Sequence, residues 1–286
     1  MTQAITCPVC GHNRSTIKTI VKKYTIWECN ECGLYWTPGI DDQELAGFYE
    51  ERYFQGSQEY GYANYVESEG VQRRNARRLI QSIADHTPRE DGLSRTKLLD
   101  VGCAHGFLVD EACRAGFQAE GVDCSVEGVR YATETLGRKV FLGTVNDAAY
   151  PDNHFDVVTS IGSIEHLNDP VRFVKEAARI TRRGALFVIT TLDTKFLMGL
   201  FRFKPPEHIY YFSRHNLPIL LGAHGFAVEQ LEAYRASHAL GEVLGLVTKL
   251  VFGSRVNLEP LIQRSPLKNL CLDLPNNEML LIARKI

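Results

Sequence analysis

Four of the eight cysteines stand in two pairs with the spacing of metal ligands. Two residues separate Cys7 from Cys10 and Cys29 from Cys32, and a glycine follows each pair. Two such turns bring four thiolates into the tetrahedral arrangement that zinc prefers. Because four cysteines close the coordination sphere, we expect a structural zinc ribbon over residues 1–40. So small a module has little core, so zinc would supply much of its folding energy. Its role is open between packing and contact with a substrate such as RNA.

A second group of candidate residues lies in the stretch 97–125. An apolar run enters a turn that contains Gly102 and Gly106, a helical pattern follows, and a second apolar run ends at Asp123. An acidic residue about 20 positions after the first glycine is typical of folds that hold the ribose of a nucleotide. The sequence therefore predicts a strand–turn–helix–strand unit that binds a nucleotide-like ligand. An ordinary strand-to-helix turn is the alternative.

The glycine turn does not match the common phosphate-binding patterns. A dinucleotide fingerprint that starts at Gly102 would need glycines where Ala104 and Phe107 stand. The turn instead resembles motif I of class I S-adenosylmethionine-dependent methyltransferases, an acidic-x-Gly-x-Gly-x-Gly pattern. It reads here as Asp100-Val101-Gly102-Cys103-Ala104-His105-Gly106, with alanine at the middle glycine.

Apolar strands alternate with helical patterns over the rest of the chain, which predicts a mainly parallel, three-layer α/β sheet. The segment 156–170 also resembles the fourth-strand region of the same methyltransferases. The resemblance implies a Rossmann-like, seven-stranded class I methyltransferase sheet over residues 71–286. Strands are expected at 98–101, 119–122, 140–143, 155–161, 185–191, 225–234 and 277–285, and helices at 71–84, 124–136, 170–180 and 214–223.

The resemblance implies roles for the residues that match the motif. Asp100, Gly102, Cys103 and Gly106 would line the methionine part of S-adenosylmethionine, mostly through backbone groups. Asp123 would bind both ribose hydroxyls.

Further cofactor contacts follow from the same resemblance. Cys124 would border the adenine, and Thr144 and Val145 would belong to the loop at its edge. Thr144 stands where an acid is frequent in the family. Ser160 and Ile161 would lie near the reacting methyl group.

The Glu165-His166 pair has two interpretations. Quinone-biosynthesis O-methyltransferases carry a glutamate three residues before such a pair and bind a divalent metal there. Gly162 stands at that place in this chain, so we expect no catalytic metal. A catalytic role for the pair is weighed against a structural one, in which Glu165 caps a helix and His166 packs as a polar residue.

Residues 204–213 resemble a Pro-Glu-His-x-x-x-Phe-Ser segment of small-molecule methyltransferases tied to glycan, lipid and secondary metabolism. Methyl transfer to a hydroxyl requires alignment of the nucleophile and removal of its proton. Since a neutral histidine accepts a proton near pH 7, we expect His208 to be the general base. His166 is the second candidate, and a water-assisted or substrate-assisted route is the third.

Three further segments are expected around this domain. Residues 41–70 hold many aromatic side chains and predict a helical arm or lid, residues 196–224 contain the lid segment, and residues 239–275 form a C-terminal insertion. Burial within the domain is the default interpretation of the insertion. It is also a candidate wall of the acceptor pocket, with a lipid-facing surface or a homodimer interface as further alternatives.

Composition limits the classes of function. The formal charge of -2 gives no basic footprint for indiscriminate nucleic-acid binding. No secretory leader opens the chain, and the apolar run 239–253 is too short to span a bilayer. Paired cysteines that bind metal are typical of a reducing compartment, so we expect a cytoplasmic protein.

These observations predict an S-adenosylmethionine-dependent methyltransferase that acts on a small molecule, with a hydroxyl on a sugar, glycan, lipid-linked glycan or similar metabolite as the acceptor. An RNA base methyltransferase that uses the ribbon for RNA contact is the alternative within the same fold. A non-catalytic cofactor-binding or zinc scaffold protein is the alternative from another class.

Overall fold

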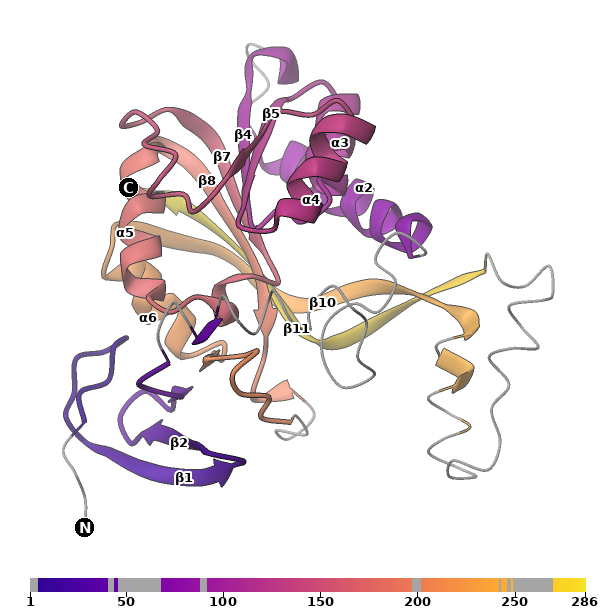
Figure 1. Ribbon diagram of the computed structural model, residues 1–286. Coiled ribbons are helices and arrows are strands. Elements are labelled where there is room, and N and C mark those ends of the chain that lie inside the picture. Colours follow the sequence, from indigo (N-terminus) through magenta and orange to yellow (C-terminus); the bar gives the residue numbers. More distant parts are fainter. Residues whose placement is uncertain are drawn as a thin grey trace.

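The computed structural model describes residues 5–40, 44–45, 68–87, 92–196, 202–241, 243–245, 248 and 270–286. The chain forms a seven-stranded sheet and a separate four-stranded sheet (Figure 1). Almost all of the expected arm over 41–70 and most of the insertion 239–275 lie outside the described residues. Within these ranges, no helix has the length and apolar character needed to cross a membrane.

The large sheet has the strand order β10-β11-β8-β7-β4-β5-β6, as expected for a Rossmann-like α/β sheet. Only β11 runs against its neighbours. The central strands are nearly continuous apolar runs because both of their faces are covered. The strands are β4 (Lys97–Val101), β5 (Gln118–Asp123), β6 (Val140–Leu142), β7 (Phe155–Ile161), β8 (Thr181–Leu192), β10 (Phe226–Ala239) and β11 (Cys271–Lys285).

Helices cover both faces of this sheet (Figure 1). α2 (Glu69–His86), α3 (Phe107–Arg114) and α4 (Val126–Arg130) lie on one side, and α5 (Pro170–Ile180) and α6 (Asn216–Gly222) lie on the other. Two apolar clusters correspond to the two faces. The helix expected over 124–136 forms as α4 followed by a π-helical turn, Tyr131–Thr135.

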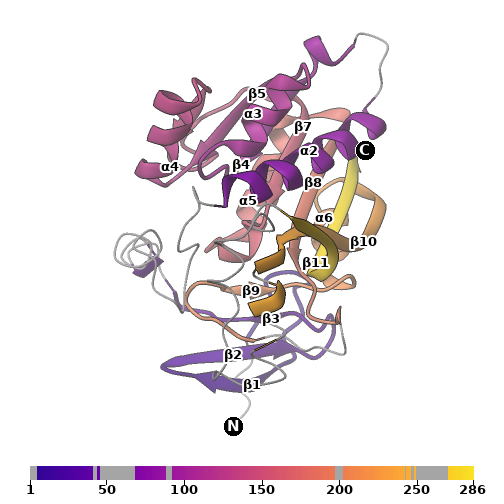
Figure 2. The same ribbon diagram turned by 90° about the vertical axis from the view of Figure 1, so that its right-hand side faces the viewer.

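The closing pair of strands is longer than the sequence predicts. Residues 235–239 pair with residues 271–275, so the end of the expected insertion belongs to a strand. Figures 1 and 2 show β10 and β11 continuing past the sheet as a two-stranded arm. Side chains from α2 hold its base, where Arg74 Nη2 lies 3.0 Å from Asp273 Oδ2 and Arg74 Nε donates to Ser237 Oγ at 2.9 Å.

The four-stranded sheet joins the N-terminal segment to the second half of the chain. Its order is β1 (Ser15–Val21), β2 (Tyr24–Cys29), β3 (Tyr35–Trp36) and β9 (Tyr210–Tyr211). The fourth strand therefore comes from the segment expected as a lid, which lies more than 170 residues away in sequence. Thr37 N also donates to Ile209 O at 2.9 Å.

The same junction has a shared core. Leu34 and Trp36 of the N-terminal segment belong to one buried cluster with Ile164, Phe212 and Leu217. Leu34 is fully buried, whereas Ile17 on β1 of the same small sheet is 54% exposed. The two sheets therefore form one packed unit.

Truncation of Leu34 tests this shared core. We expect Leu34→Ala to lower the free energy of unfolding by about 2–5 kcal/mol, because a fully buried side chain is replaced by a cavity. Ile17→Ala, on the exposed face of the same sheet, should change it by less than about 0.5 kcal/mol. Urea unfolding followed by fluorescence measures both. A shared core would be contradicted if the N-terminal segment of Leu34→Ala unfolded in a separate transition at lower urea concentration while the main transition kept its midpoint.

Candidate active site

The glycine turn at the end of β4 is held in a conformation that needs glycine. Gly102 and Gly106 have φ of +78° and +76°, in the left-handed region that L side chains rarely adopt. A Cβ at Gly102 would lie 2.7 Å from Ser163 Cβ, and one at Gly106 would lie 2.8 Å from Ala132 Cβ. Ala104, at the middle glycine position of the motif, also has a positive φ of +46°. The alanine thus keeps the backbone path of the motif.

Asp123 fixes this turn against the end of β5. Its Oδ2 accepts from Ala104 N at 2.7 Å and its Oδ1 accepts from Ser125 N at 2.7 Å. Burial raises the pKa of Asp123, while these backbone donors oppose the shift. Each carboxylate oxygen has a second lone pair, so the group can also accept from external hydroxyls.

Asp100 is a buried carboxyl under the same turn. Thr159 Oγ1 donates to Asp100 Oδ1 at 2.6 Å. Burial raises the pKa of Asp100 to about 7, and the Thr159 hydrogen bond partly offsets this. A cationic ligand in the turn would favour the charged form of this acid.

Glu165, His166 and His208 lie together although two segments of the chain supply them. Glu165 and His166 end the short 3-10 helix η4 (Ile164–His166), which follows β7, and His208 precedes β9. One ligand atom from each of the three side chains lies within 4.8 Å of the others. The two imidazole rings are 4.7 Å apart and nearly perpendicular, at 83°. All three candidate catalytic residues of the sequence are therefore in one cluster.

Hydrogen bonds hold this cluster from both segments. Thr191 Oγ1 on β8 donates to Glu165 Oε2 at 2.8 Å, and Ile209 N donates to Glu165 O at 2.9 Å. His166 Nδ1 lies 2.6 Å from Glu207 O. Since a carbonyl oxygen only accepts, Nδ1 carries the proton and the lone pair of His166 is on Nε2.

Burial perturbs the pKa of each member of the cluster. Burial, together with the neighbouring His166 and Lys204, lowers the pKa of His208 to about 2. The pKa of His166 is also lowered by burial. Burial, with a smaller contribution from the Glu207 carboxylate, raises the pKa of Glu165 to about 7. Both imidazoles are neutral at pH 7, but a proton on His208 is strongly disfavoured in this surrounding.

Residues 69–231, more than half of the chain, match the sequence family described as a methyltransferase domain. The chain belongs to this family. With the fold, this membership makes it an S-adenosylmethionine-dependent methyltransferase.

Individual relatives are more distant. The chain is 30% identical over 122 residues to the ubiquinone biosynthesis O-methyltransferase of Pelagibacter ubique. This match covers 41% of this chain and 50% of that protein. It is 31% identical over 134 residues to the enzyme of that name from Idiomarina loihiensis, covering 44% and 54%. The chain thus spans about half the length of these curated relatives.

Solved structures show the same fold at low sequence identity. A methyltransferase from Archaeoglobus fulgidus, described as S-adenosylmethionine-dependent, superposes with a TM-score of 0.54 at 17% identity. The match covers 78% of this chain and 100% of that chain.

Residues of the methyltransferase turn fit the cofactor that the family uses. The turn lacks room for side chains at Gly102 and Gly106, so the backbone can approach a ligand. Asp123 is placed to accept from hydroxyls, and Asp100 offers a carboxyl to a cationic group. These residues would hold the ribose and the methionine part of S-adenosylmethionine, respectively.

Other residues expected near the cofactor divide into buried and exposed ones. Cys103, Val145 and Ser160 are buried, Ile161 is half-buried, and Cys124 and Thr144 are exposed. Ser160 Oγ lies 2.6 Å from Ser163 Oγ, so its hydroxyl is used inside the protein.

Sequence reasoning missed four residues that shape the site. Asp147 Oδ2 accepts from both Thr144 N and Thr144 Oγ1, at 3.0 and 2.6 Å, which places a carboxylate on the loop that is expected to border the adenine. Ser163 donates to Val101 O at 3.0 Å and packs against the glycine turn. Thr191 and Glu207 support the cluster. Only Asp147 and Glu207 had a sequence signal, as acids beside positions already singled out.

The four cysteines of the N-terminal segment also lie together. Their sulfur atoms lie within 4.8 Å of one another, with Cys7 Sγ 3.7 Å from Cys32 Sγ and Cys10 Sγ 3.5 Å from Cys29 Sγ. Tetrahedral zinc with bonds of about 2.3 Å separates its sulfurs by about 3.8 Å. The geometry therefore fits a four-cysteine zinc site.

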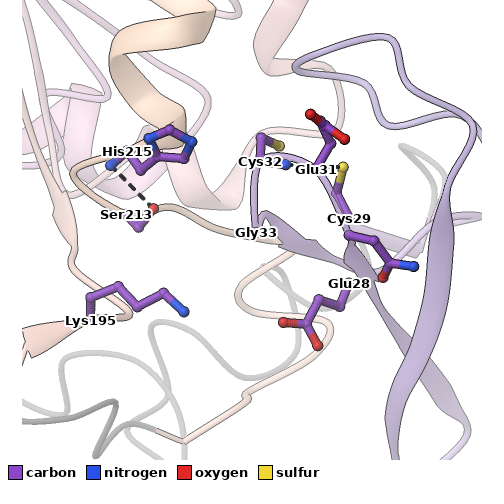
Figure 3. Close-up of a pocket in the computed structure, with 9 residues that line it drawn as sticks. Glu28, Cys29, Glu31, Cys32, Gly33, Lys195, Ser213 and His215 are labelled. Atoms are coloured by element: carbon purple, nitrogen blue, oxygen red, sulfur yellow. Dashed lines mark hydrogen bonds between the residues drawn. The ribbon is translucent and has the colours of Figure 1, made fainter.

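A groove of about 520 Å³ lies where this segment meets the methyltransferase domain (Figure 3). None of its lining residues belongs to the glycine turn or to the histidine cluster. The lining residues are Glu28, Cys29, Asn30, Glu31, Cys32, Gly33, Lys195, Ser213 and His215.

Two glycines with similar backbone conformation provide a test of the turn. We expect Gly102→Ala to weaken S-adenosylmethionine binding by at least about tenfold, since the added methyl group would lie 2.7 Å from Ser163 Cβ and the turn must move. Gly137→Ala has a comparable positive φ of +66° but no atom within 4 Å of the new Cβ, so it should bind the cofactor like the parent. Isothermal titration calorimetry measures both affinities. Equal affinities in the two variants would contradict the assignment.

Proposed function

We propose that this methyltransferase transfers a methyl group from S-adenosylmethionine to a hydroxyl of a small-molecule acceptor. The observation that supports it is the cluster of the buried Glu165 with the half-buried His166 and His208 beside the glycine turn. Ser163, two residues before Glu165, packs against Gly102. The cluster is therefore close to the glycine turn in space. The two relatives described above are both named O-methyltransferases.

In this reaction the chain must position the acceptor and remove its proton. When bound, S-adenosylmethionine supplies a methyl group whose bond to sulfur breaks as the acceptor oxygen forms the new carbon–oxygen bond, and the electron pair stays on sulfur. Neutral imidazoles and the Glu165 carboxyl can accept a hydrogen bond from the acceptor hydroxyl and hold it in line. The low pKa of His208 argues against its expected role as general base, which stays a prediction. We therefore propose that the cluster mainly binds and orients the hydroxyl, and that the hydroxyl proton passes to Nε2 of the neutral His166 or to water as the carbon–oxygen bond forms.

The class of acceptor is supported in part by what the site offers. A partly buried polar cluster suits a hydroxyl that enters the protein, which a small molecule can supply. The narrower proposal of a sugar, glycan or lipid-linked glycan rests on the resemblance of residues 204–213 alone. The other outcomes of a direct assay are methylation of RNA and no methylation of any acceptor.

Labelled cofactor tests the proposed acceptor class. We expect methyl label from S-adenosylmethionine to enter the small-molecule fraction of a cell extract, separated beforehand from lipid-linked glycans and from RNA. Mass spectrometry of the labelled product should show a methyl ether. Gly102→Ala serves as the control for cofactor-dependent labelling. Label in RNA alone, or in no fraction despite cofactor binding, would contradict small-molecule O-methylation.

We also propose that the four cysteines hold a structural zinc ion that keeps the catalytic cluster in place. β3 follows the second cysteine pair and pairs with β9, which begins two residues after His208. Asn216 Nδ2 also donates to Cys32 O at 3.4 Å. Metal at the cysteines would thus hold the segment that carries His208.

Removal of one cysteine ligand tests this structural role. We expect Cys29→Ser to lose the thiolate-bound zinc and to lower both the melting temperature and the methyl transfer rate, because β3 and β9 lose their support. Cys113→Ser, a cysteine outside the group, should change neither property. Metal analysis, thermal melting and the transfer assay measure the effects. Full activity in a Cys29→Ser protein without thiolate-bound zinc would show that the cysteine site does not support the cluster.

A further inference from the structure

We propose that the acceptor of this methyltransferase carries a protonated amine beside the hydroxyl that is methylated, and that three carboxylates bind this amine. The carboxylates are those of Glu165, Glu207 and Glu278. An amino alcohol is the simplest molecule of this class. The inference rests on the proposed function, because it names the chemical class of the molecule that receives the methyl group.

These three acids come from separate segments that meet at the candidate active site. Glu165 lies in η4 after β7, Glu207 lies in the segment before β9, and Glu278 on β11 pairs with the last residue of β8. Thr191 Oγ1 donates to Glu165 Oε2 at 2.8 Å, and Thr191 pairs with the residue that follows Glu278. The charge of Glu165 acts on Glu278, and that of Glu207 acts on Glu165. The three carboxylates therefore form one acidic group around Glu165.

The acidic group has no positive partner in the part of the chain that the structure describes. Glu165 is 5% exposed, Glu207 is 7% exposed, and Glu278 is half-buried. Within the described ranges, no basic side chain forms an ion pair with any of the three. Lys204 is the nearby basic group, but it is exposed and its charge acts on the two histidines. Since buried charges in native proteins are paired, this arrangement indicates a cation supplied by a ligand.

A buried oxygen of Glu207 points to a ligand with hydrogen-bond donors. Glu207 Oε2 is buried and has no hydrogen-bond partner among the described residues. The charge of this carboxylate acts on both Glu165 and His166, so it lies close to the cluster. A buried polar atom without a partner is costly and rare in native proteins. An ammonium group has three N–H donors and no acceptor, so it would supply both the missing hydrogen bond and the missing charge.

The pKa values of the acidic group agree with a missing positive charge. Burial raises the pKa of Glu165 to about 7. Burial, and then the charge of Glu165, raises the pKa of Glu278 to about 7. A nearby ammonium would favour the ionised form of both acids and lower both values. Binding of an amine would therefore keep these carboxylates charged at pH 7.

The cofactor does not account for this charge, because its expected residues lie elsewhere on the sheet. Gly102 and Asp123 are at the ends of β4 and β5. The acidic group lies at β7, β8 and β11, on the other side of β4 in the strand order. We assign the cationic part of S-adenosylmethionine to Asp100, which is under the glycine turn. The second positive charge then has to come with the acceptor.

Binding of an ammonium by the acidic group would divide the roles of the two polar groups of the acceptor. A protonated amine has no lone pair and cannot attack the methyl group. The hydroxyl would thus be the nucleophile, and its proton would pass to Nε2 of His166 or to water, as in the proposed function. Charge-assisted hydrogen bonds to the amine would hold the hydroxyl in line with the methyl group.

Ion exchange of the labelled product tests the inference with the full-length protein. We expect the labelled methyl ether from the small-molecule fraction to bind a cation exchanger at pH 7. Strongly alkaline buffer, which deprotonates an amine, should release it. A labelled methyl ether that is neutral or acidic at pH 7 would overturn the inference and leave the proposed function in place. An N-methylated product would also overturn it, and no labelled small molecule at all would contradict the proposed function itself.

Glu278→Gln removes one negative charge and nearly keeps the shape of the side chain. We expect the KM for the isolated acceptor to rise by about 10–100-fold while kcat changes by less than about threefold, because a charge-assisted hydrogen bond to the bound acceptor is lost. Glu232→Gln, at an exposed position of β10, should keep the KM of the parent. Unchanged S-adenosylmethionine affinity, measured by calorimetry, shows that both variants are folded. Equal KM values in Glu278→Gln and the parent would overturn the binding role of Glu278.

An analogue of the acceptor with a hydroxyl in place of the amine tests the contact directly. In the parent, this replacement should raise KM about as much as Glu278→Gln does. In Glu278→Gln, the same replacement should add little further loss, because the charged pair is already broken. Losses that simply add would show that Glu278 does not hold the amine.

Discussion

The pairing of β3 with β9 is the interaction on which the arrangement of the catalytic side depends. Two short strands, Tyr35–Trp36 and Tyr210–Tyr211, join segments that are remote in sequence. Their side chains are buried in a core shared by the N-terminal segment and the methyltransferase domain. Because His208 stands just before β9, this pairing fixes the distance between His208 and His166. The N-terminal segment is thus part of the architecture of the cluster.

Crowding at the carboxyl ends of the parallel strands shapes the cofactor side. Gly102 at the end of β4 packs against Ser163, which follows β7. Asp123 at the end of β5 accepts a hydrogen bond from Ala104 N in the glycine turn. The carboxyl ends of neighbouring parallel strands meet at one edge of the sheet, and open α/β sheets bind their ligands at this edge. Burial at this edge also explains the raised pKa values of Asp100 and Glu165.

The cluster draws its three members from two segments of the chain. Related quinone-biosynthesis enzymes resemble this chain in the Glu165-His166 pair, but Gly162 lacks the expected carboxylate. Gly162 has a φ of +59°, which suits a glycine there, and its amide donates to Thr190 O at 2.9 Å. Gly162 thus contributes through its backbone, and the third side chain of the cluster is that of His208. The sequence around the Glu165-His166 pair does not reveal this third member.

The sequence by itself determined the local elements and the residue types of the site. Periodicity predicted β7 and α5 with their observed bounds. The spacing of the cysteines and of the glycines identified the cysteine turns and the glycine turn. These patterns depend on contacts between near neighbours in the sequence. Tertiary structure alone decided that β9 completes the N-terminal sheet and that β10 and β11 extend beyond the large sheet. It also decided that His208 meets Glu165 and His166, and that burial makes His208 a poor proton acceptor. Those features depend on which distant segments pack together and on the water that packing excludes, and neither is encoded in the spacing of residues along the chain.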